Sequence, residues 1–179
     1  MRWRIIRIMA NGLTFSRKTT SPEATKQLAS TLSPYLREGD VIVLSGDLGA
    51  GKTQFVQGVA AGLGIRDQVT SPTFNLLLTY PSETLPLYHF DLYRLDGADQ
   101  LEDIGFYETI DGDGASFLEW GEKFPEALPY GYLDISIKVE PDGNRVVRAH
   151  ALGDRSRQLL FVWAKDSKSR LMKCAGGTA

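Results

Sequence analysis

Apolar residues follow two different spacings in the first third of the chain, and each spacing predicts a different element. Val41 to Leu44 is an unbroken aliphatic run, which is typical of a strand buried within a parallel sheet. After it, apolar residues recur at helical spacing from Phe55 to Leu63, and Gly62 and Gly64 offer a stop. The pattern therefore predicts a strand, a short connection and a helix between residues 41 and 64.

Four later segments read as strands that pair in two antiparallel hairpins. Phe74 to Tyr80 and Leu85 to Tyr93 are separated by a Pro-Ser-Glu-Thr turn. Leu133 to Val139 alternates apolar and polar residues and leads through a Pro-Asp-Gly-Asn turn into Arg145 to Leu152. Together with the first strand and helix, these hairpins predict an α/β fold: a P-loop NTPase-like sheet with flanking helices and antiparallel hairpins.

Helical signals elsewhere in the chain are less regular. A Thr/Ser cap followed by Pro22 and Glu23 opens a predicted helix, which Pro34 should end or kink. Ala98 to Tyr107 is weakly helical. Near the C-terminus only Leu159 to Lys165 reads as a short helix, and the Gly-rich end after it is expected to be mobile.

The composition is that of a soluble globular protein. The 179 residues are 42% hydrophobic and 23% charged, which suits a single domain with a sizeable core. No apolar run approaches the ~20 residues of a membrane-spanning helix. The single cysteine, Cys174, rules out an internal disulfide and a cysteine-based metal site, so we expect a cytoplasmic protein without membrane contact.

Charge is distributed unevenly along the chain. Residues 1–18 carry five Lys/Arg and no acid, and residues 154–179 carry six Lys/Arg and two Asp. Residues 19–153 hold nine Lys/Arg against 20 Asp/Glu, a net charge of −11. An acidic body is not a nucleic-acid-binding surface, so only the basic ends could touch RNA or an acidic partner. We predict one domain over residues 1–153 and a basic, mobile C-terminal extension over 154–179.

The connection after the first strand carries the strongest chemical signal. It reads Gly46-Asp47-Leu48-Gly49-Ala50-Gly51-Lys52-Thr53, which matches G-x-x-x-x-G-K-[ST], the phosphate-binding loop of nucleotide hydrolases. Its glycines let successive backbone N–H groups point at one centre, and the following helix adds the positive end of its dipole. Lys52 can reach the β- and γ-phosphates, and the Thr53 hydroxyl can hold Mg²⁺.

A second element of a nucleotide site follows later in the chain. Ser116 to Leu118 is a short apolar strand that ends in Glu119. A carboxylate at this end of a strand beside a phosphate loop is placed to face Mg²⁺. On the strand from Leu85 to Tyr93, Asp91 and His89 share a face, and His89 is interpreted as a packed or partly exposed side chain and not as a catalyst.

The nucleotide is predicted to be ATP. GTPases read guanine with an Asn-Lys-x-Asp motif, which this chain lacks. A small-molecule kinase would usually show an arginine-rich lid, but the only arginines between 64 and 130 are Arg66 and Arg94. Three readings stay open on these grounds: an accessory ATPase, a stand-alone ATP-dependent phosphotransferase acting on a small molecule, and a nucleotide-binding scaffold without turnover.

Four motifs, in order and spacing, resemble the TsaE (YjeE) family. They are the phosphate loop, Ser71-Pro72-Thr73-Phe74, Tyr88-His89-Phe90-Asp91-Leu92-Tyr93-Arg94-Leu95 and Leu118-Glu119-Trp120. The resemblance covers roughly residues 15–153. Residues 1–14 precede the usual family start and are read as an extension, which makes Met9 an alternative initiator, and residues 154–179 lie beyond the match.

The resemblance implies a small P-loop ATPase that uses ATP and Mg²⁺ and is needed to form threonylcarbamoyladenosine beside the anticodon of tRNA. Family members bind a TsaB–TsaD heterodimer, in which TsaD transfers the threonylcarbamoyl group. The ATPase is weak alone and resets or regulates that complex, so tRNA is expected to be met only through the complex.

The resemblance also assigns roles to single residues. It implies that Lys52 holds phosphates and that Thr53 and Glu119 hold Mg²⁺. Asp91 lies in the family's essential strand motif, so Lys52, Asp91 and Glu119 are the predicted catalytic residues. Residues 71–73 are expected to form a switch-like loop. Trp120 is a family signature residue, and two roles stay open for it: packing within the protein and contact with a partner.

Overall fold

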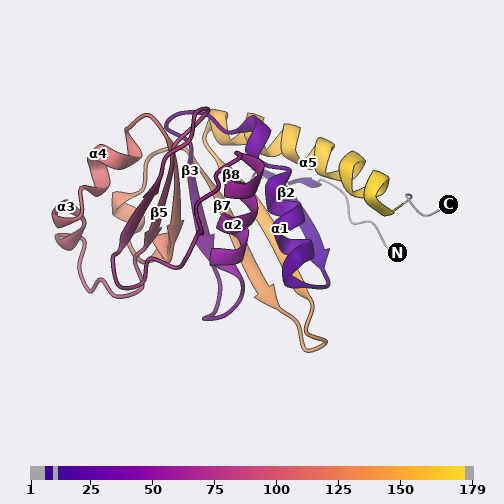
Figure 1. Cartoon of the computed structure of the whole chain (residues 1–179), viewed down its shortest axis with the longest axis horizontal. Helices are drawn as coiled ribbons and strands as arrows, with labels where there is room; N and C mark the ends of the chain where they lie inside the picture. The colour runs from indigo at the N-terminus through magenta and orange to yellow at the C-terminus, as the bar shows by residue number, and fades with distance from the viewer. Residues whose placement is uncertain (1–6, 10–11, 176–179) are drawn as a thin grey trace.

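Eight strands form one mixed sheet, and helices cover both of its faces (Figure 1). The computed structural model describes residues 7–9 and 12–175, with side chains from residue 13 to residue 167. The strands are β1 (Arg7–Met9), β2 (Gly12–Thr19), β3 (Val41–Ser45), β4 (Leu77–Tyr80), β5 (Leu87–Asp91), β6 (Ala115–Glu119), β7 (Tyr132–Val139) and β8 (Arg145–Leu152). The helices are α1 (Pro22–Ser30), α2 (Lys52–Gly62), α3 (Gln100–Asp103), α4 (Phe106–Ile110) and α5 (Asp154–Ala175), with the 3₁₀ turns η1 (Ser33–Tyr35), η2 (Gly121–Lys123) and η3 (Pro125–Ala127).

The strand order is β1-β2-β8-β7-β3-β6-β5-β4. The central strands β7, β3, β6 and β5 run parallel, and antiparallel strands extend the sheet on both sides. Both predicted hairpins are confirmed, since β4 pairs with β5 and β7 pairs with β8. The predicted fold class, a P-loop NTPase-like sheet with flanking helices and antiparallel hairpins, is confirmed as well.

The sheet separates two hydrophobic cores. Helices α1, α2 and α5 contribute to the larger core, where Phe55 is fully buried, and α3, α4 and the 3₁₀ turns contribute to the smaller one. Along β3, Ile42 and Leu44 belong to the larger core, whereas Val41 and Val43 belong to the smaller. Because β3 is buried on both faces, its sequence is a continuous apolar run and does not alternate.

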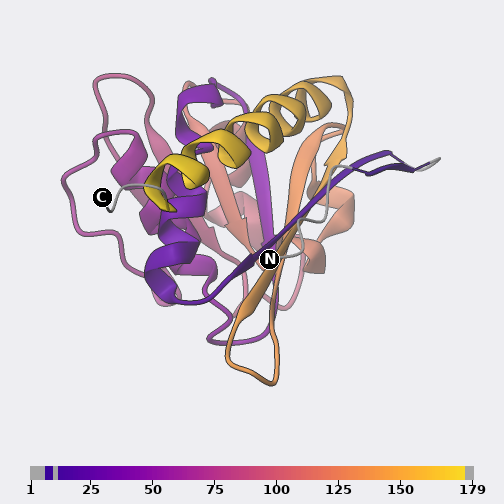
Figure 2. The same cartoon turned by 90° about the vertical axis from the view of Figure 1, so that its right-hand side faces the viewer.

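Helix α5 differs most from the sequence-based expectation. It has 22 residues, whereas the sequence predicted a short helix from Leu159 to Lys165. Its buried residues, Leu159, Leu160, Trp163 and Ala164, join the larger core, and Figure 2 shows the helix lying across this part of the molecule. The prediction was too short because residues 165–170 are all polar and interrupt the apolar spacing of the helix.

The expectation of a mobile extension is therefore wrong for residues 154–167, because this part of α5 buries apolar side chains in the larger core. The expectation for the Gly-rich end falls on residues 176–179, which lie outside the described residues, as do residues 1–6 with the basic N-terminus. Met9 lies in β1, which pairs with β2, so residues 7–9 continue the sheet.

Trp163 is the residue through which α5 is expected to stabilise the fold. Its ring lies 5.0 Å from that of Phe15 and 6.0 Å from that of Phe55, and its Nε1 donates a hydrogen bond of 2.9 Å to Thr31 Oγ1. Replacing Trp163 with alanine leaves a large cavity and removes one of the two hydrogen-bond partners of the buried Thr31 hydroxyl, so we expect a loss of about 3–5 kcal/mol in the free energy of unfolding. Urea denaturation followed by circular dichroism measures this, with the exposed neighbour Phe161→Ala as the control. Equal midpoints for the two variants would contradict the packing of α5.

An ion pair ties the start of α5 to the start of β3. Arg155 donates from Nε and Nη2 to the two carboxylate oxygens of Asp40, at 2.9 and 2.5 Å, and Asp40 is only 5% exposed. Two parallel N–H···O bonds of this kind fix geometry as well as charge. The basic residues after 153 therefore include at least one that serves the fold.

Smaller differences concern the ends of elements. The weakly helical stretch from Ala98 to Tyr107 forms two short helices, α3 and α4, because Gly105 adopts a left-handed conformation between them. Strand β4 begins only at Leu77, because Leu76 also has a positive φ of 62° and interrupts the extended backbone. Phe74 therefore belongs to the loop before the strand. Helix α1 ends at Ser30, and Pro34 lies after it in η1, which agrees with the expectation that Pro34 does not continue the helix.

Candidate functional site

The phosphate-loop motif connects β3 to α2, at the carboxyl end of β3, where the sequence placed it. Gly46 and Gly51 both have positive φ, at 139° and 111°. A side chain at Gly46 would put its Cβ 2.3 Å from the backbone oxygen of Ile137, so the loop packs directly on β7. Gly51 is the N-cap residue of α2, so the N-terminus of this helix adjoins the loop. The loop is thus held against the sheet by residues that allow close backbone approach.

Replacing Gly46 with alanine is expected to destabilise the protein as well as the loop. The added Cβ meets backbone and not a flexible side chain, so the loop or β7 must shift, at a cost of about 1–3 kcal/mol. Thermal unfolding measures this. The control is Gly49→Ala, which has a strained φ of 79° but nothing within 4 Å of the added carbon. A melting temperature for Gly46→Ala at or above that of Gly49→Ala would contradict the close approach.

Lys52 folds across the loop that precedes it. Its Nζ donates hydrogen bonds to the backbone oxygens of Gly46 at 2.8 Å and Asp47 at 3.1 Å, and it lies 4.2 Å from the centre of the Trp120 ring. Burial lowers the pKa of the Lys52 ammonium, and the carboxylates of Glu119 and other nearby acids oppose that shift. The nearby carboxylates favour the charged form of Lys52, and a charged ammonium beside the glycines of the loop can donate to an anionic ligand.

Thr53 and Glu119, which are 66 positions apart in the sequence, meet beside the loop. Thr53 Oγ1 donates a hydrogen bond of 2.7 Å to Glu119 Oε1. The contact forms because β3 and β6 are adjacent parallel strands, with Leu44 opposite Glu119, and Thr53 lies in the first turn of α2. Glu119 is 4% exposed, so its carboxylate is held in one place by its partners. The structure therefore brings the two predicted metal residues together.

Asp91 lies on the next strand and holds the loop that follows α2. It is 3% exposed, and its Oδ2 accepts hydrogen bonds from Ser71 Oγ at 3.3 Å and from Thr73 Oγ1 at 2.5 Å. Its Oδ1 accepts from the backbone N–H of Tyr93 at 3.0 Å. In the register of β5 and β6 it lies directly opposite Glu119. Asp91 thus connects the predicted switch-like loop to the strand that carries Glu119.

Trp120 and several exposed apolar side chains surround this edge of the sheet. The backbone of Trp120 adopts the left-handed helical conformation, with a φ of 63°. The centre of its ring lies 5.1 Å from that of Tyr93. A bulky residue in this conformation is strained, and such strain is often found at functional sites. Leu48 in the phosphate loop is 82% exposed, and Phe74 in the loop held by Asp91 is 85% exposed. Both are exposed apolar side chains on the two loops of the candidate site.

Two residues of the site were missed by the sequence-based analysis. Arg145, at the start of β8, donates from Nε to the backbone oxygen of Ala50 at 3.2 Å and so braces the phosphate loop. His89, interpreted as a packed or partly exposed side chain, is completely buried, and its Nε2 lies 2.9 Å from Glu119 Oε1. Only the pairing of strands distant in sequence reveals either contact. The period-two spacing of His89 and Asp91 on one strand face was the available signal.

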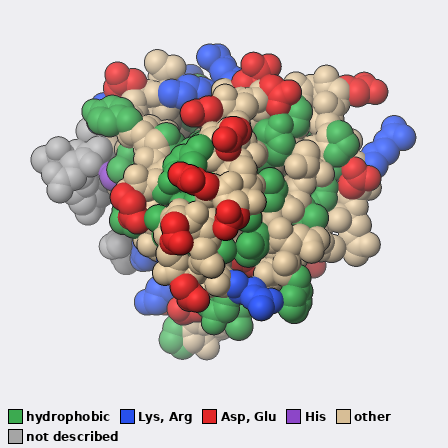
Figure 3. All heavy atoms as spheres, turned by 90° about the vertical axis from the view of Figure 1, so that its left-hand side faces the viewer, with side chains coloured by type: hydrophobic (Ala, Val, Ile, Leu, Met, Phe, Trp, Pro, Cys, Tyr) green, Lys and Arg blue, Asp and Glu red, His purple; other side chains and the backbone are tan. Residues whose placement is uncertain are grey.

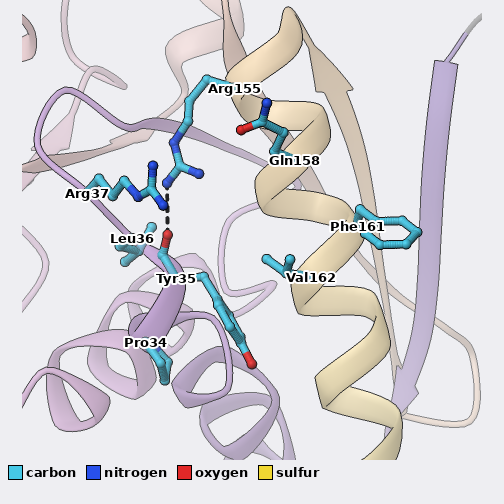
Figure 4. A pocket seen from close by; sticks show the side chains of 8 residues that line it. All are labelled: Pro34, Tyr35, Leu36, Arg37, Arg155, Gln158, Phe161 and Val162. Atoms are coloured by element: carbon cyan, nitrogen blue, oxygen red, sulfur yellow. Dashed lines mark hydrogen bonds between the residues drawn. The ribbon is translucent and has the colours of Figure 1, made fainter.

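Two other surfaces lie away from the loop. A cavity of about 380 Å³ lies between η1 and α5, where Tyr35, Arg37, Arg155 and Phe161 are among its lining residues (Figure 4). Arg155 there donates to the backbone oxygen of Tyr35 and to Asp40, at the opposite end of β3 from the phosphate loop. Asp and Glu side chains gather on the face that carries α3 and α4 (Figure 3).

The comparisons with known proteins agree on one family. Residues 19–147 match the model of the family described as threonylcarbamoyl adenosine biosynthesis protein TsaE. The chain is similar to the tRNA threonylcarbamoyladenosine biosynthesis protein TsaE of Bacillus subtilis, with 43% identity over 79% of this chain and 89% of that protein. It is also similar to the protein of the same name from Treponema pallidum, with 45% identity over 71% of this chain and 93% of that protein.

A solved structure gives the same result. The crystal structure of Bacillus subtilis YdiB superposes with a TM-score of 0.74 and 34% sequence identity, covering 92% of this chain and 99% of that one. The family match, 129 residues long, contains the phosphate loop, the loop held by Asp91 and the strand that ends in Glu119. This chain therefore belongs to the TsaE family.

Proposed function

We propose that this chain is a Mg²⁺-dependent P-loop ATPase that takes part in forming threonylcarbamoyladenosine in tRNA. The observation that carries the proposal is the hydrogen bond between Thr53 and Glu119, which joins the phosphate loop to the strand beside it. Lys52 reaches across the same loop. A phosphate loop, a helix N-terminus and a metal-facing carboxylate are the parts that phosphoryl transfer needs, since it depends on positioning and on neutralising charge.

The residues present fit Mg²⁺. Thr53 and Glu119 offer a hydroxyl and a carboxylate oxygen at one point, and Mg²⁺ prefers such hard oxygen ligands. Two protein oxygens are fewer than the octahedral set that Mg²⁺ requires, so phosphate oxygens and water would complete it. When bound, Mg²⁺ neutralises charge on the phosphates that would otherwise repel an attacking water. Lys52 supplies the second positive charge, and Asp91 fixes the loop over residues 71–73.

The partner we propose is a TsaB–TsaD heterodimer, with tRNA met only through that complex. Leu48 on the phosphate loop and Phe74 on the loop held by Asp91 are exposed and would let a partner sense whether the site is filled. Acidic side chains on the face that carries α3 and α4 argue against direct RNA binding there. Within the part of the chain that the structure describes, no helix is long and apolar enough to cross a membrane. We place the protein in the cytoplasm.

Titration of the isolated chain with a fluorescent ATP analogue tests the nucleotide site. We expect saturable binding that tightens when Mg²⁺ is added and that unlabelled ATP displaces much better than GTP. Binding that Mg²⁺ leaves unchanged, or equal displacement by GTP, would contradict the proposed site.

A further inference from the structure

Glu119 depends on two donors from different layers of the fold. Its Oε1 accepts from Thr53 Oγ1 on α2 and from His89 Nε2 on β5, at 2.7 and 2.9 Å. Among the described residues no hydrogen bond reaches Oε2, which leaves that oxygen available to a ligand. A buried carboxylate is costly unless it is hydrogen-bonded, so these two contacts decide where Glu119 lies.

The contact with Glu119 is the only hydrogen bond that the described structure gives the side chain of His89. The side chain of His89 is completely buried, and its Nδ1 is buried without a hydrogen-bond partner. An apolar residue would fill the same space without leaving a polar atom unpaired. Because a carboxylate oxygen only accepts hydrogen bonds, Nε2 must carry the proton that is shared with Glu119. Burying an imidazole here therefore has one evident benefit, which is to hold Glu119.

The surroundings of His89 make it a rigid support. It lies on β5 between Leu87, which is fully buried, and Asp91, which holds the loop over residues 71–73. Strand β5 is bonded on both sides, to β4 and to β6. Thr53, in contrast, belongs to the first turn of the helix that leaves the phosphate loop. His89 is thus the one donor to Glu119 that comes from the interior of the sheet.

We propose that His89 is a positioning residue, which orients Glu119 so that Oε2 faces the Mg²⁺ bound with the nucleotide. The proposal rests on the proposed function, because it assigns His89 to the same metal site. Residues that orient a metal ligand through a hydrogen bond commonly change metal affinity by about 10–100-fold when they are replaced. His89 is expected to act on metal affinity and to leave the phosphate loop itself unchanged.

Three variants separate positioning from packing. His89→Leu introduces an apolar side chain of similar size and so removes the hydrogen-bond donor. His89→Gln can place its amide nitrogen near the position of Nε2, whereas the amide of His89→Asn is too short to reach Glu119. The measurement is the Mg²⁺ concentration that gives half of the Mg²⁺-dependent increase in affinity for a fluorescent ATP analogue. Affinity in EDTA and the melting temperature are measured alongside.

We expect His89→Leu and His89→Asn to need about 10-fold more Mg²⁺, and His89→Gln to need less than about threefold more. Affinity in EDTA should be the same for all. A folded His89→Leu with the wild-type Mg²⁺ requirement would overturn the proposal. If His89→Leu does not fold, equal requirements for the Gln and Asn variants would overturn it instead. If the wild-type protein binds the analogue equally with and without Mg²⁺, the proposed function fails first, and the two failures remain distinct.

Discussion

Replacing Lys52 with alanine is expected to lower ATP hydrolysis by about 10²–10³-fold, because the variant loses a positive charge placed where phosphate charge develops. Among the described residues, Nζ of Lys52 bonds to backbone oxygens of its own loop and contacts the Trp120 ring. Lys52 belongs to neither hydrophobic core, so the fold should persist. Hydrolysis is measured as phosphate release at saturating ATP, with circular dichroism to confirm folding.

A matched control separates this effect from a general loss of positive charge. Lys165→Ala removes the same charge from an exposed position on α5 and should hydrolyse ATP at the wild-type rate. Wild-type hydrolysis by a folded Lys52→Ala protein would rule out the assignment of the phosphate loop.

The Glu119→Gln variant should hydrolyse ATP about 10²-fold more slowly than the wild type, or slower still. It should still bind nucleotide when Mg²⁺ is absent. Glutamine keeps an oxygen that can accept from Thr53 and His89, so the packing of the strand end should survive. It loses the negative charge that would face the metal. The expected signature is a nucleotide affinity that no longer responds to Mg²⁺.

The control for Glu119 is Glu126→Gln, an exposed position in η3. This variant should keep the Mg²⁺ response. If Glu119→Gln turns over normally at limiting Mg²⁺, Glu119 only ends its strand, and the metal site must be sought elsewhere.

Local patterns in the sequence were sufficient to predict most of the sheet. The apolar run of β3, the turn residues of both hairpins and the glycines of the loop each depend on neighbours in the chain. The same local reasoning failed for α5. Residues 165–170 of this helix are all polar, so the apolar spacing that predicts a helix stops at Ala164 although the helix continues.

The site shows the same division between local and long-range information. Lys52 and Thr53 were predicted from one continuous motif, and Glu119 from a strand end read beside that motif. The contacts made by His89 and Arg145 depend on which elements become neighbours, here β5 beside β6 and the β7–β8 hairpin beside β3. No spacing within the sequence encodes those pairings, because the partners are 30 and 95 positions apart. The role of His89 was therefore inferred from how often histidines are buried in proteins in general, and its contact with Glu119 was not predicted.

We propose above all that this chain is an ATPase whose activity belongs to a tRNA-modifying complex. The most direct measurement is its rate of ATP hydrolysis alone, with a TsaB–TsaD pair, and with that pair plus tRNA, using Lys52→Ala as the blank throughout. We expect slow hydrolysis alone and a clear increase with the partner proteins, which Lys52→Ala abolishes. Hydrolysis that the partner proteins leave unchanged, but that a small-molecule acceptor stimulates in the isolated chain, would contradict the account and favour a stand-alone phosphotransferase.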